Sequence, residues 1–149
     1  MRIVLQRVTE GSVAVDSQIV GRTGPGAVVL VGIAPTDGVD EAKWFAEKVA
    51  NLRVWPDEDG KMNRSLLDVG GSALVVSQFT LYGDARKGRR PSFIRAAQGP
   101  EAEAVYERCV AELRAAGVAC ETGVFGAMMQ VSLVNDGPVT ILLDSEKTF

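Results

Sequence analysis

The segment that most constrains the fold is an uninterrupted apolar run, Ala27-Val28-Val29-Leu30-Val31-Gly32-Ile33, which follows the chain breaker Gly24-Pro25-Gly26. The run is rich in β-branched residues and does not alternate between polar and apolar positions. A strand of this kind is apolar on both faces, so it is stable only where both faces are covered. The run therefore predicts a central strand with protein packed on each side.

Two helices are predicted, one before and one after the middle of the chain. In the first, Asp40 is expected to cap the start, and apolar residues then repeat at helical spacing: Ala42, Phe45, Ala46 and Val49. The second lies between Pro100, which suits a first helical position, and Gly117, which suits a left-handed stop. Its buried stripe is predicted to be Ala102, Val105, Cys109 and Leu113.

The remaining elements are predicted to be strands. They are expected over residues 3–8, 12–16, 19–20, 52–55, 74–79, 119–122, 130–134 and 139–143. Strands outnumber helices and most connections are short, which favours an α+β fold with a barrel-like, mostly antiparallel or mixed sheet and two main helices packed outside. With 149 residues, no repeat and no linker, residues 1–149 are expected to form one domain.

Composition narrows the possible functions. No apolar stretch reaches the length of about 18 residues that a membrane span needs, and the N-terminus enters a strand pattern without the features of a signal peptide, so a cytoplasmic protein is expected. Cys109 and Cys120 are interpreted as buried thiols, and with two cysteines and no histidine in the chain a tetrahedral zinc site is not expected. The net charge of −3 disfavours a general nucleic-acid coat but allows a local basic site.

The first candidate motif is Ser77-Gln78-Phe79-Thr80-Leu81-Tyr82, at the end of a predicted strand. One interpretation is structural: Phe79 packs in the core, and the two hydroxyls satisfy neighbouring backbone. The other is that the backbone turns here and presents N–H groups and a hydroxyl to a ligand carbonyl, whose oxygen they stabilise as it becomes negative. A covalent role for Thr80 requires an adjacent base. No histidine exists to serve, and the pattern brings neither Lys61 nor Lys87 beside Thr80.

The second candidate motif is Asn135-Asp136-Gly137-Pro138-Val139-Thr140. Asp136-Gly137 between two apolar runs is typical of a hairpin, and Pro138 suits the first position of a strand. Only about 5–6% of X–Pro bonds in folded proteins are cis, so the residues alone favour a trans bond.

A dense basic cluster, Arg86-Lys87-Gly88-Arg89-Arg90, interrupts an otherwise acidic chain. A charge run of this length is either a solvated loop or a site that contacts the phosphates of a nucleic acid, and the sequence leaves both interpretations open.

Together the two motifs resemble the signatures of the D-aminoacyl-tRNA deacylases, and the resemblance extends over essentially the whole chain, from Met1-Arg2-Ile3-Val4-Leu5-Gln6-Arg7-Val8 to the last strand. It implies a homodimeric hydrolase with the active site at the subunit interface, acting without a metal or organic cofactor. The implied substrates are D-aminoacyl-tRNA and glycyl-tRNA, the latter being glycine mischarged on the tRNA for alanine. Because Ser77 and Phe79 are present, the resemblance implies strict specificity for D-amino acids and glycine.

The resemblance also implies roles for individual residues. Ser77, Gln78, Phe79 and Thr80 position the ester while the neighbouring ribose hydroxyl of the tRNA assists hydrolysis. Gly137 and Pro138 form a cis peptide that enters the partner subunit's pocket, where its carbonyls face the α-ammonium and leave no room for an L side chain. The remaining implied contacts are made by Arg7 to the Gly-Pro carbonyls, by Phe125 and Met129 near the adenosine, and by a basic loop close to the active site that contains Arg86, Lys87, Arg89 and Arg90.

Two alternatives use the same residues differently. In one, Thr80 is the nucleophile of an esterase or amidase that acts on small molecules. In the other, the chain is a non-catalytic RNA-binding module that uses the cluster 86–90.

Overall fold

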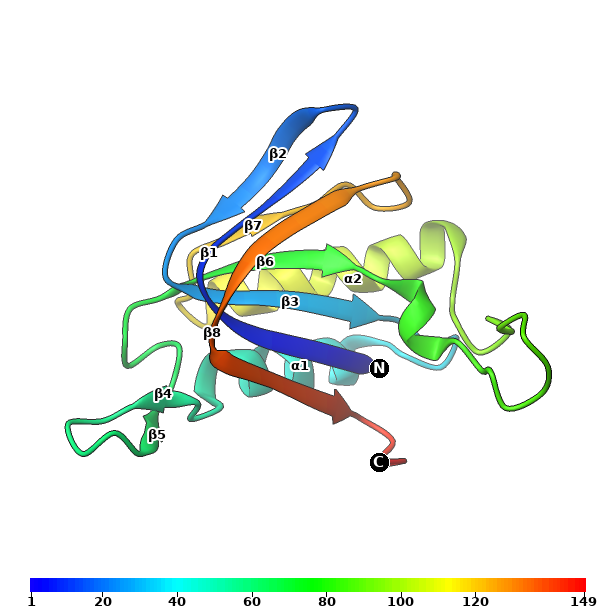
Figure 1. The fold of residues 1–149 in the computed structure, drawn as a ribbon. Coiled ribbons are helices and arrows are strands. Elements are labelled where there is room, and N and C mark those ends of the chain that lie inside the picture. The colour runs from blue at the N-terminus through cyan, green and yellow to red at the C-terminus, as the bar shows by residue number, and fades with distance from the viewer.

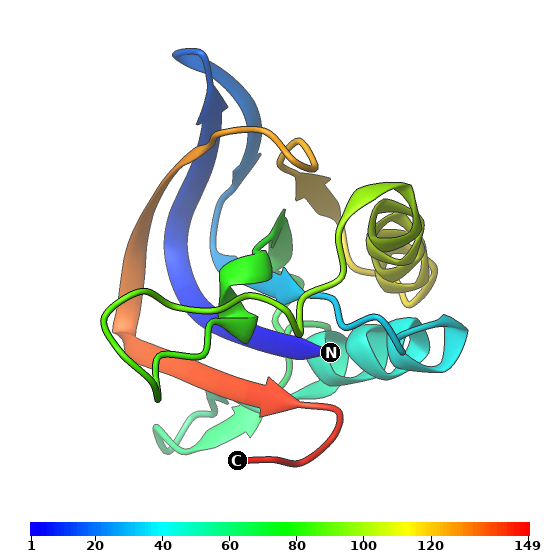
Figure 2. The same cartoon turned by 90° about the vertical axis from the view of Figure 1, so that its right-hand side faces the viewer.

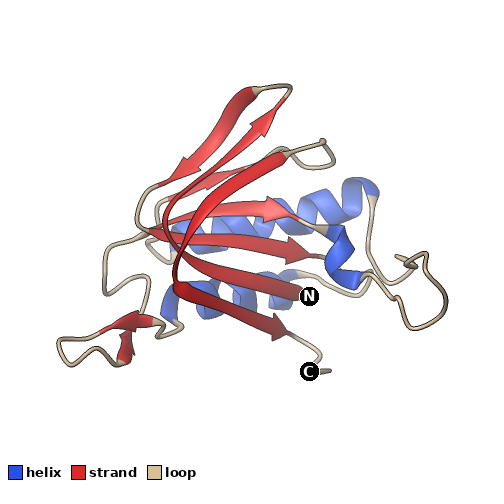
Figure 3. Ribbon diagram, viewed as in Figure 1, coloured by secondary structure: helices blue, strands red, loops and turns tan.

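The computed structural model describes residues 1–149 and is dominated by one curved, mixed sheet (Figures 1 and 3). The strand order is β2-β1-β3-β6-β7, and β8 pairs with the remaining edge of β1. The strands are β1 (Arg2–Val15), β2 (Gln18–Thr23), β3 (Gly26–Gly32), β6 (Ser72–Ser77), β7 (Cys120–Thr122) and β8 (Gln130–Asp144).

The apolar run predicted to be central is β3, and that prediction is confirmed. β3 pairs antiparallel with β1 and parallel with β6. Its two faces belong to two different clusters of buried side chains. Val29 packs in the main core, whereas Val28 packs on the other face against Val8 and Val13. Burial on both faces explains why this strand carries no polar alternation.

Helices α1 (Val39–Asn51) and α2 (Gly99–Ala115) lie side by side against one face of the sheet (Figure 2). Phe45, Cys109 and Leu113 are fully buried between them and the sheet. Removing a buried aromatic such as Phe45 costs about 3–5 kcal/mol, so this layer anchors the fold. The apolar stripe of α2 is largely as predicted, although Val105 is only half-buried. Neither helix has the length and apolar character that a membrane span requires.

The start of α1 differs from the prediction. The helix begins one residue after Gly38, and Asp40 lies inside the first turn, so Asp40 is not the cap. Glu41 reaches back instead, and its carboxylate accepts a hydrogen bond of 2.8 Å from the Gly38 N–H. This contact satisfies one of the N–H groups that a helix start leaves without a partner.

The barrel-like shape comes from the length of β1. Residues 2–8 of this strand pair with β3, and residues 11–15 pair with β2, so β1 continues past β3 and carries β2 over the sheet. There the Arg22 N–H donates to the Glu121 carboxylate of β7 at 2.6 Å. The sheet thus folds back on itself with two helices outside, which confirms the predicted α+β class.

Two pairs of predicted strands are in fact single long strands. Residues 3–8 and 12–16 both belong to β1, and residues 130–134 and 139–143 both belong to β8. The hairpin interpretation of Asp136-Gly137 is therefore wrong. The Asn135 side chain explains the continuity, since its amide donates to the carbonyls of Arg7 (2.8 Å) and Val139 (2.9 Å) where the ladder register shifts. The Gly137–Pro138 peptide bond is cis.

Two further predicted strands are shorter than expected. The predicted strand 52–55 is reduced to β4 (Trp55–Pro56), which pairs with β5 (Met62–Arg64) in a small separate hairpin. The predicted strand 74–79 ends at Ser77, and a short 3₁₀ helix, η1 (Phe79–Tyr82), follows it. The first motif therefore spans the transition from β6 to η1.

Candidate active site

The structure contains one cavity of about 320 Å³ and another of about 620 Å³. Residues of the first motif line the larger one. This larger cavity, here called the η1 pocket, measures about 620 Å³ and is lined mostly by apolar side chains. It lies among the ends of β3 and β6, η1, the start of α2 and the loop 125–129. Six of the residues predicted for the site line it: Ser77, Gln78, Phe79, Thr80, Phe125 and Met129.

The turn that places the first motif at this pocket is fixed by backbone contacts. The Gln78 N–H donates to the Val31 carbonyl at 2.8 Å, and the Leu81 N–H then donates to the Gln78 carbonyl at 3.3 Å. Gly32 allows the close packing, because a Cβ there would lie 3.0 Å from the Gln78 oxygen and 3.1 Å from the Leu81 Cβ. The N–H groups of Phe79 and Thr80 precede the first hydrogen bond of the turn, which leaves them suited to bind an acceptor on a ligand.

Phe79 does not pack in the core, so the structural interpretation of this residue is wrong. Its side chain is 48% exposed at the pocket, where its ring meets the Phe93 ring edge-on at 5.2 Å between centroids. Phe93 follows the basic cluster in the chain, so the contact links the pocket to that cluster. No role was predicted for Phe93 from the sequence. The one signal that could have suggested a role is its position three residues after the basic cluster.

The Thr80 hydroxyl is exposed and forms a hydrogen bond with the Gln78 side-chain amide at 2.5 Å. An amide N–H is a donor, so it takes no proton from the hydroxyl. Lys61 lies in the turn between β4 and β5, and Lys87 lies in an exposed loop. Thr80 is therefore bonded to a neutral donor rather than to a base, which gives no support to a covalent nucleophile.

Phe125 and Met129, from the loop after β7, also line the pocket. Phe125 packs on the Tyr106 ring at 5.7 Å, and the Tyr106 hydroxyl donates to the Val75 carbonyl at 2.9 Å. Burial raises the pKa of Tyr106 well above its ordinary value, so this phenol stays neutral and serves as a support. The pocket also involves residues that sequence reasoning did not single out, namely Gln98, Gly99, Ala127 and Met128.

The second motif is held from behind by Arg7. The Arg7 side chain is nearly buried, donates to the carbonyls of Val54 (2.6 Å) and Asp136 (3.2 Å), and pairs with the Asp136 carboxylate at 3.1 Å. Arg7 therefore does not point to solvent, as a cation within an apolar strand usually does. Its hydrogen bonds go to the carbonyls of Val54 and Asp136 and not, as the resemblance implies, to those of Gly137 and Pro138. Gly137 has a φ of +126°, and a Cβ at this position would lie 3.1 Å from Arg7 Nη2. The arginine and the glycine therefore fit each other closely.

The two motifs lie at opposite ends of the same strand ladder. Ser77 pairs with Val31 at one end of β3, whereas Arg7 pairs with Ala27 at the other end. At about 3.3 Å per residue, these positions are roughly 13 Å apart along the strand. Gly137, Pro138 and Arg7 do not line the η1 pocket of their own chain.

The basic cluster lies on an exposed loop, here called the basic loop, that spans residues 84–92. Asp84 and Ser92 close the loop with two backbone hydrogen bonds of 2.8 and 2.9 Å. The hydrogen bonds from Arg86 hold the pKa of Asp84 far below its usual range, and the two side chains pair at 2.6 Å. All four cations are exposed, but only Arg86 is paired with a carboxylate of the loop, whereas Lys87, Arg89 and Arg90 form no ion pair.

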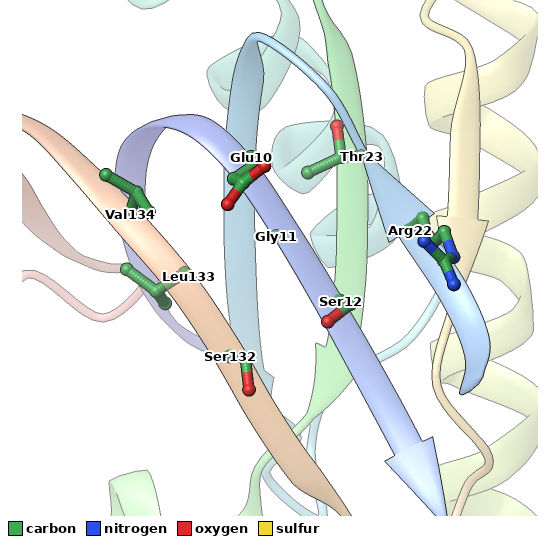
Figure 4. A pocket seen from close by; sticks show the side chains of 8 residues that line it. All are labelled: Glu10, Gly11, Ser12, Arg22, Thr23, Ser132, Leu133 and Val134. Atoms are coloured by element: carbon green, nitrogen blue, oxygen red, sulfur yellow. The ribbon is translucent and has the colours of Figure 1, made fainter. Parts of the chain in front are cut away.

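The smaller cavity, of about 320 Å³, is a polar hollow on the outer part of the sheet (Figure 4). Its residues come from three neighbouring strands, β8, β1 and β2. None of the residues predicted for the site lies there. The predicted site residues instead divide between the η1 pocket, the second motif and the basic loop.

Comparison with known proteins gives consistent results. The family model for D-Tyr-tRNA(Tyr) deacylase matches residues 4–144. A D-aminoacyl-tRNA deacylase of Thermomicrobium roseum is 63% identical, over 97% of this chain and 94% of that protein. Another from Thermus aquaticus is 60% identical, over 99% and 97%. A third from Fervidobacterium nodosum is 56% identical over the full length of both chains.

Solved structures agree with these relatives. The c-Myc DNA Unwinding Element Binding Protein superimposes with a TM-score of 0.90 at 41% identity, over 97% of this chain and 99% of that one. A probable eukaryotic D-amino acid tRNA deacylase has the same fold at 19% identity, with a TM-score of 0.81 over 95% and 97%. From the family model and the full-length relatives, this chain belongs to the D-Tyr-tRNA(Tyr) deacylase family.

Proposed function

We propose that this chain hydrolyses the ester that joins a D-amino acid, or glycine mischarged on the tRNA for alanine, to the terminal adenosine of tRNA. Membership of the family carries the proposal, and it is supported by the first motif lining a mostly apolar pocket. The products are free tRNA and the amino acid. In the same proposal, residues 1–149 act as one cytoplasmic domain without a metal or organic cofactor.

The chemistry requires positioning more than a reactive side chain. Water attacks the carbonyl carbon, the bond from that carbon to the ribose oxygen breaks, and the ribose oxygen takes up a proton. Negative charge develops on the carbonyl oxygen, and the N–H groups of Phe79 and Thr80 are suited to receive it. One such donor is worth about 100- to 1,000-fold in rate. The adjacent ribose hydroxyl assists proton transfer, which suits a chain without histidine.

Chiral selection is assigned to the second motif of a partner copy in a homodimer. Two observations support this assignment. Gly137 and Pro138 do not line the η1 pocket of their own chain, and Arg7 holds the motif in a defined shape. Backbone carbonyls of Gly137 and Pro138 then face the α-ammonium and exclude any L side chain at the α-carbon. Because this exclusion does not depend on the rest of the side chain, many D-amino acids are accepted. Glycine has no side chain to exclude, so it is accepted too.

Binding of the tRNA body is assigned to the basic loop. Lys87, Arg89 and Arg90 are exposed, and the Phe93–Phe79 contact brings the end of this loop to the pocket. Cations placed there contact phosphates near the acylated end.

The test is deacylation of matched D-, L- and glycyl-tRNA by the purified protein. Rapid loss of the D-amino acid and of glycine, with the L-ester spared, is expected. Ala127→Trp is the control, because a bulky ring on this pocket-lining residue blocks the site without altering the sheet. Equal rates on the D and L esters of one amino acid would contradict the selection by backbone. Binding of charged and uncharged tRNA without turnover would favour a non-catalytic RNA-binding module.

A further inference from the structure

The far side of η1 is held by a cluster of side chains that the proposed chemistry does not use. Arg2, from the start of β1, donates from Nη1 to the Leu81 carbonyl at 3.0 Å. Leu81 lies inside η1, one residue after Thr80. This contact therefore joins the first residues of the chain to the turn that carries the first motif.

The guanidinium of Arg2 is itself fixed on several sides. It lies over the rings of Tyr82 and Phe149, at 4.7 and 5.4 Å from their centroids. Arg2 Nε lies 3.4 Å from the carboxylate of Asp144, whose side chain is 1% exposed. Arg2, Tyr82, Asp144, Thr148 and Phe149 are called the Arg2 cluster below.

The chain after β8 organises this cluster. The Thr148 hydroxyl donates to the Asp144 carboxylate and accepts a hydrogen bond of 3.5 Å from Arg2 Nη2. Glu146, in the same segment, pairs at 3.0 Å with Arg95, whose guanidinium lies 5.8 Å from the Tyr82 ring. Burial alone would raise the pKa of Asp144, but hydrogen bonds from Thr148 and the Glu146 N–H outweigh it, and the pKa lies below its usual value. Asp144 therefore stays charged opposite Arg2.

We propose that Arg2 is a positioning residue for the η1 pocket, and that segment 144–149 sets its position. An arginine suits this use because its planar group donates to a carbonyl, pairs with a carboxylate and stacks on rings at the same time. Losing the bond to Leu81 loosens the turn from behind and moves the N–H groups of Phe79 and Thr80 out of alignment. The effect on catalysis rests on the proposed function, whereas the effect on the turn does not.

The experiment compares Arg2→Met with Arg2→Lys and with Arg64→Met. Arg64 is the matched control, since it pairs with Glu58 at 2.7 Å on the separate hairpin, at the opposite end of the molecule from the turn that follows β6 (Figure 1). The first readout is amide hydrogen exchange without substrate. Exchange of the Leu81 and Gly83 amides, whose N–H groups are hydrogen-bonded within the turn, is expected to accelerate by about tenfold or more in Arg2→Met, with α1 unchanged, because local opening requires only that the local interactions break.

The second readout is deacylation of D-aminoacyl-tRNA. In Arg2→Met, kcat is expected to fall about tenfold while KM changes less than about twofold, because the turn is misaligned and the tRNA contacts are intact. Arg2→Lys retains the charge opposite Asp144 but lacks the planar fork, so it recovers only part of the rate. Arg64→Met matches the wild type in both readouts.

Unchanged exchange of the Leu81 and Gly83 amides in folded Arg2→Met would overturn the proposal. If Arg2→Met does not fold, Phe149→Ala decides, because that ring is 63% exposed and its loss leaves the core intact. Phe149→Ala is expected to accelerate exchange at η1 more weakly, and no acceleration would overturn the proposal. An inactive wild-type protein with the expected exchange pattern would refute the deacylase function and leave the positioning role supported.

Discussion

The two motifs of this chain are held in opposite ways. The first, Ser77–Tyr82, lines a pocket that its own chain builds, and the N–H groups of Phe79 and Thr80 precede the first hydrogen bond of its turn. The second, Asn135–Thr140, lies in the middle of the longest strand, and its polar groups are bonded within the chain. The first motif lines a cavity that can hold a ligand, whereas the second is held in a fixed shape, and its Gly137 and Pro138 line neither of the two cavities described above.

The difference indicates what each motif contributes. An open turn suits stabilisation of a developing charge, because its donors are free and already oriented. A rigid segment suits the exclusion of a side chain from a site, because a segment that moves aside would admit the side chain that it should exclude. Arg7 provides that rigidity through two carbonyls and one carboxylate. If the wall closes the pocket of a second copy, each site needs the first motif of one chain and the second motif of the other.

The largest predicted effect comes from Gly137→Ala. A Cβ there would lie 2.8 Å from Val139 Cγ2, and the φ of +126° is unfavourable for alanine. The distorted segment should lower the rate on D-aminoacyl-tRNA by about a hundredfold, as small misplacements at a site do. Single-turnover hydrolysis checks this, with circular dichroism to establish that the fold is kept.

Mixing two inactive variants then tests whether the motifs act in separate chains. Ala127→Trp blocks the pocket, and Gly137→Ala disrupts the second motif. In a mixed twofold dimer one site receives both defects and the other receives none, so random exchange should restore about a quarter of wild-type activity. No recovery after demonstrated subunit exchange would refute a shared site.

Arg7→Leu should have the next largest effect. The change leaves the carbonyl of Val54 without its donor in a buried place, which costs about 1–3 kcal/mol. The free energy of unfolding, measured in urea, should fall by that amount. The ratio of D to L hydrolysis should fall as well, because the wall loses its brace. Arg64→Leu, on the separate hairpin, is the control and should change neither quantity.

Neutralising the basic loop should give a smaller and different effect. Replacing Lys87, Arg89 and Arg90 with glutamine should weaken tRNA binding and reduce the slope of log K against log salt by about 0.7–0.9 for each phosphate that is no longer neutralised. Arg86→Gln should change the slope less, since Arg86 is already paired with Asp84. Thermal stability should not change, because the loop is exposed. An unchanged slope in the triple variant would mean that the loop is only solvated.

The sequence predicted the elements whose signals are local. The run 27–33 shows its burial by its unbroken apolar composition, the helix that contains Phe45 shows it by its periodicity, and both predictions were correct. The path of β8 was missed because the decisive contact is distant. Asn135-Asp136-Gly137-Pro138 has the local pattern of a turn, and it remains a strand because Asn135 bonds to the Arg7 carbonyl, 128 positions away in the chain.

The same limit applies to the candidate site. Resemblance supplied both motifs, but the residues alone favoured a buried Phe79. That interpretation was wrong, because the end of β6 and the packing of η1 on Gly32 determine where the Phe79 side chain points. The position of Arg7 depends on the carbonyls of Val54 and Asp136, which come from two other parts of the chain. No local pattern contains that information.

The smallest predicted effect is that of Thr80→Ala, and it tests the character of the open motif. The hydroxyl is bonded to the Gln78 amide, and both groups are near solvent, so water replaces this hydrogen bond in the variant. The backbone N–H groups remain, and the rate should stay within about threefold of the wild type. A substrate whose terminal adenosine lacks the neighbouring 2′-hydroxyl should instead bind normally and hydrolyse very slowly. Full activity on that substrate, together with an inactive Thr80→Ala variant and an acyl group recoverable on the wild-type protein, would establish Thr80 as a covalent nucleophile.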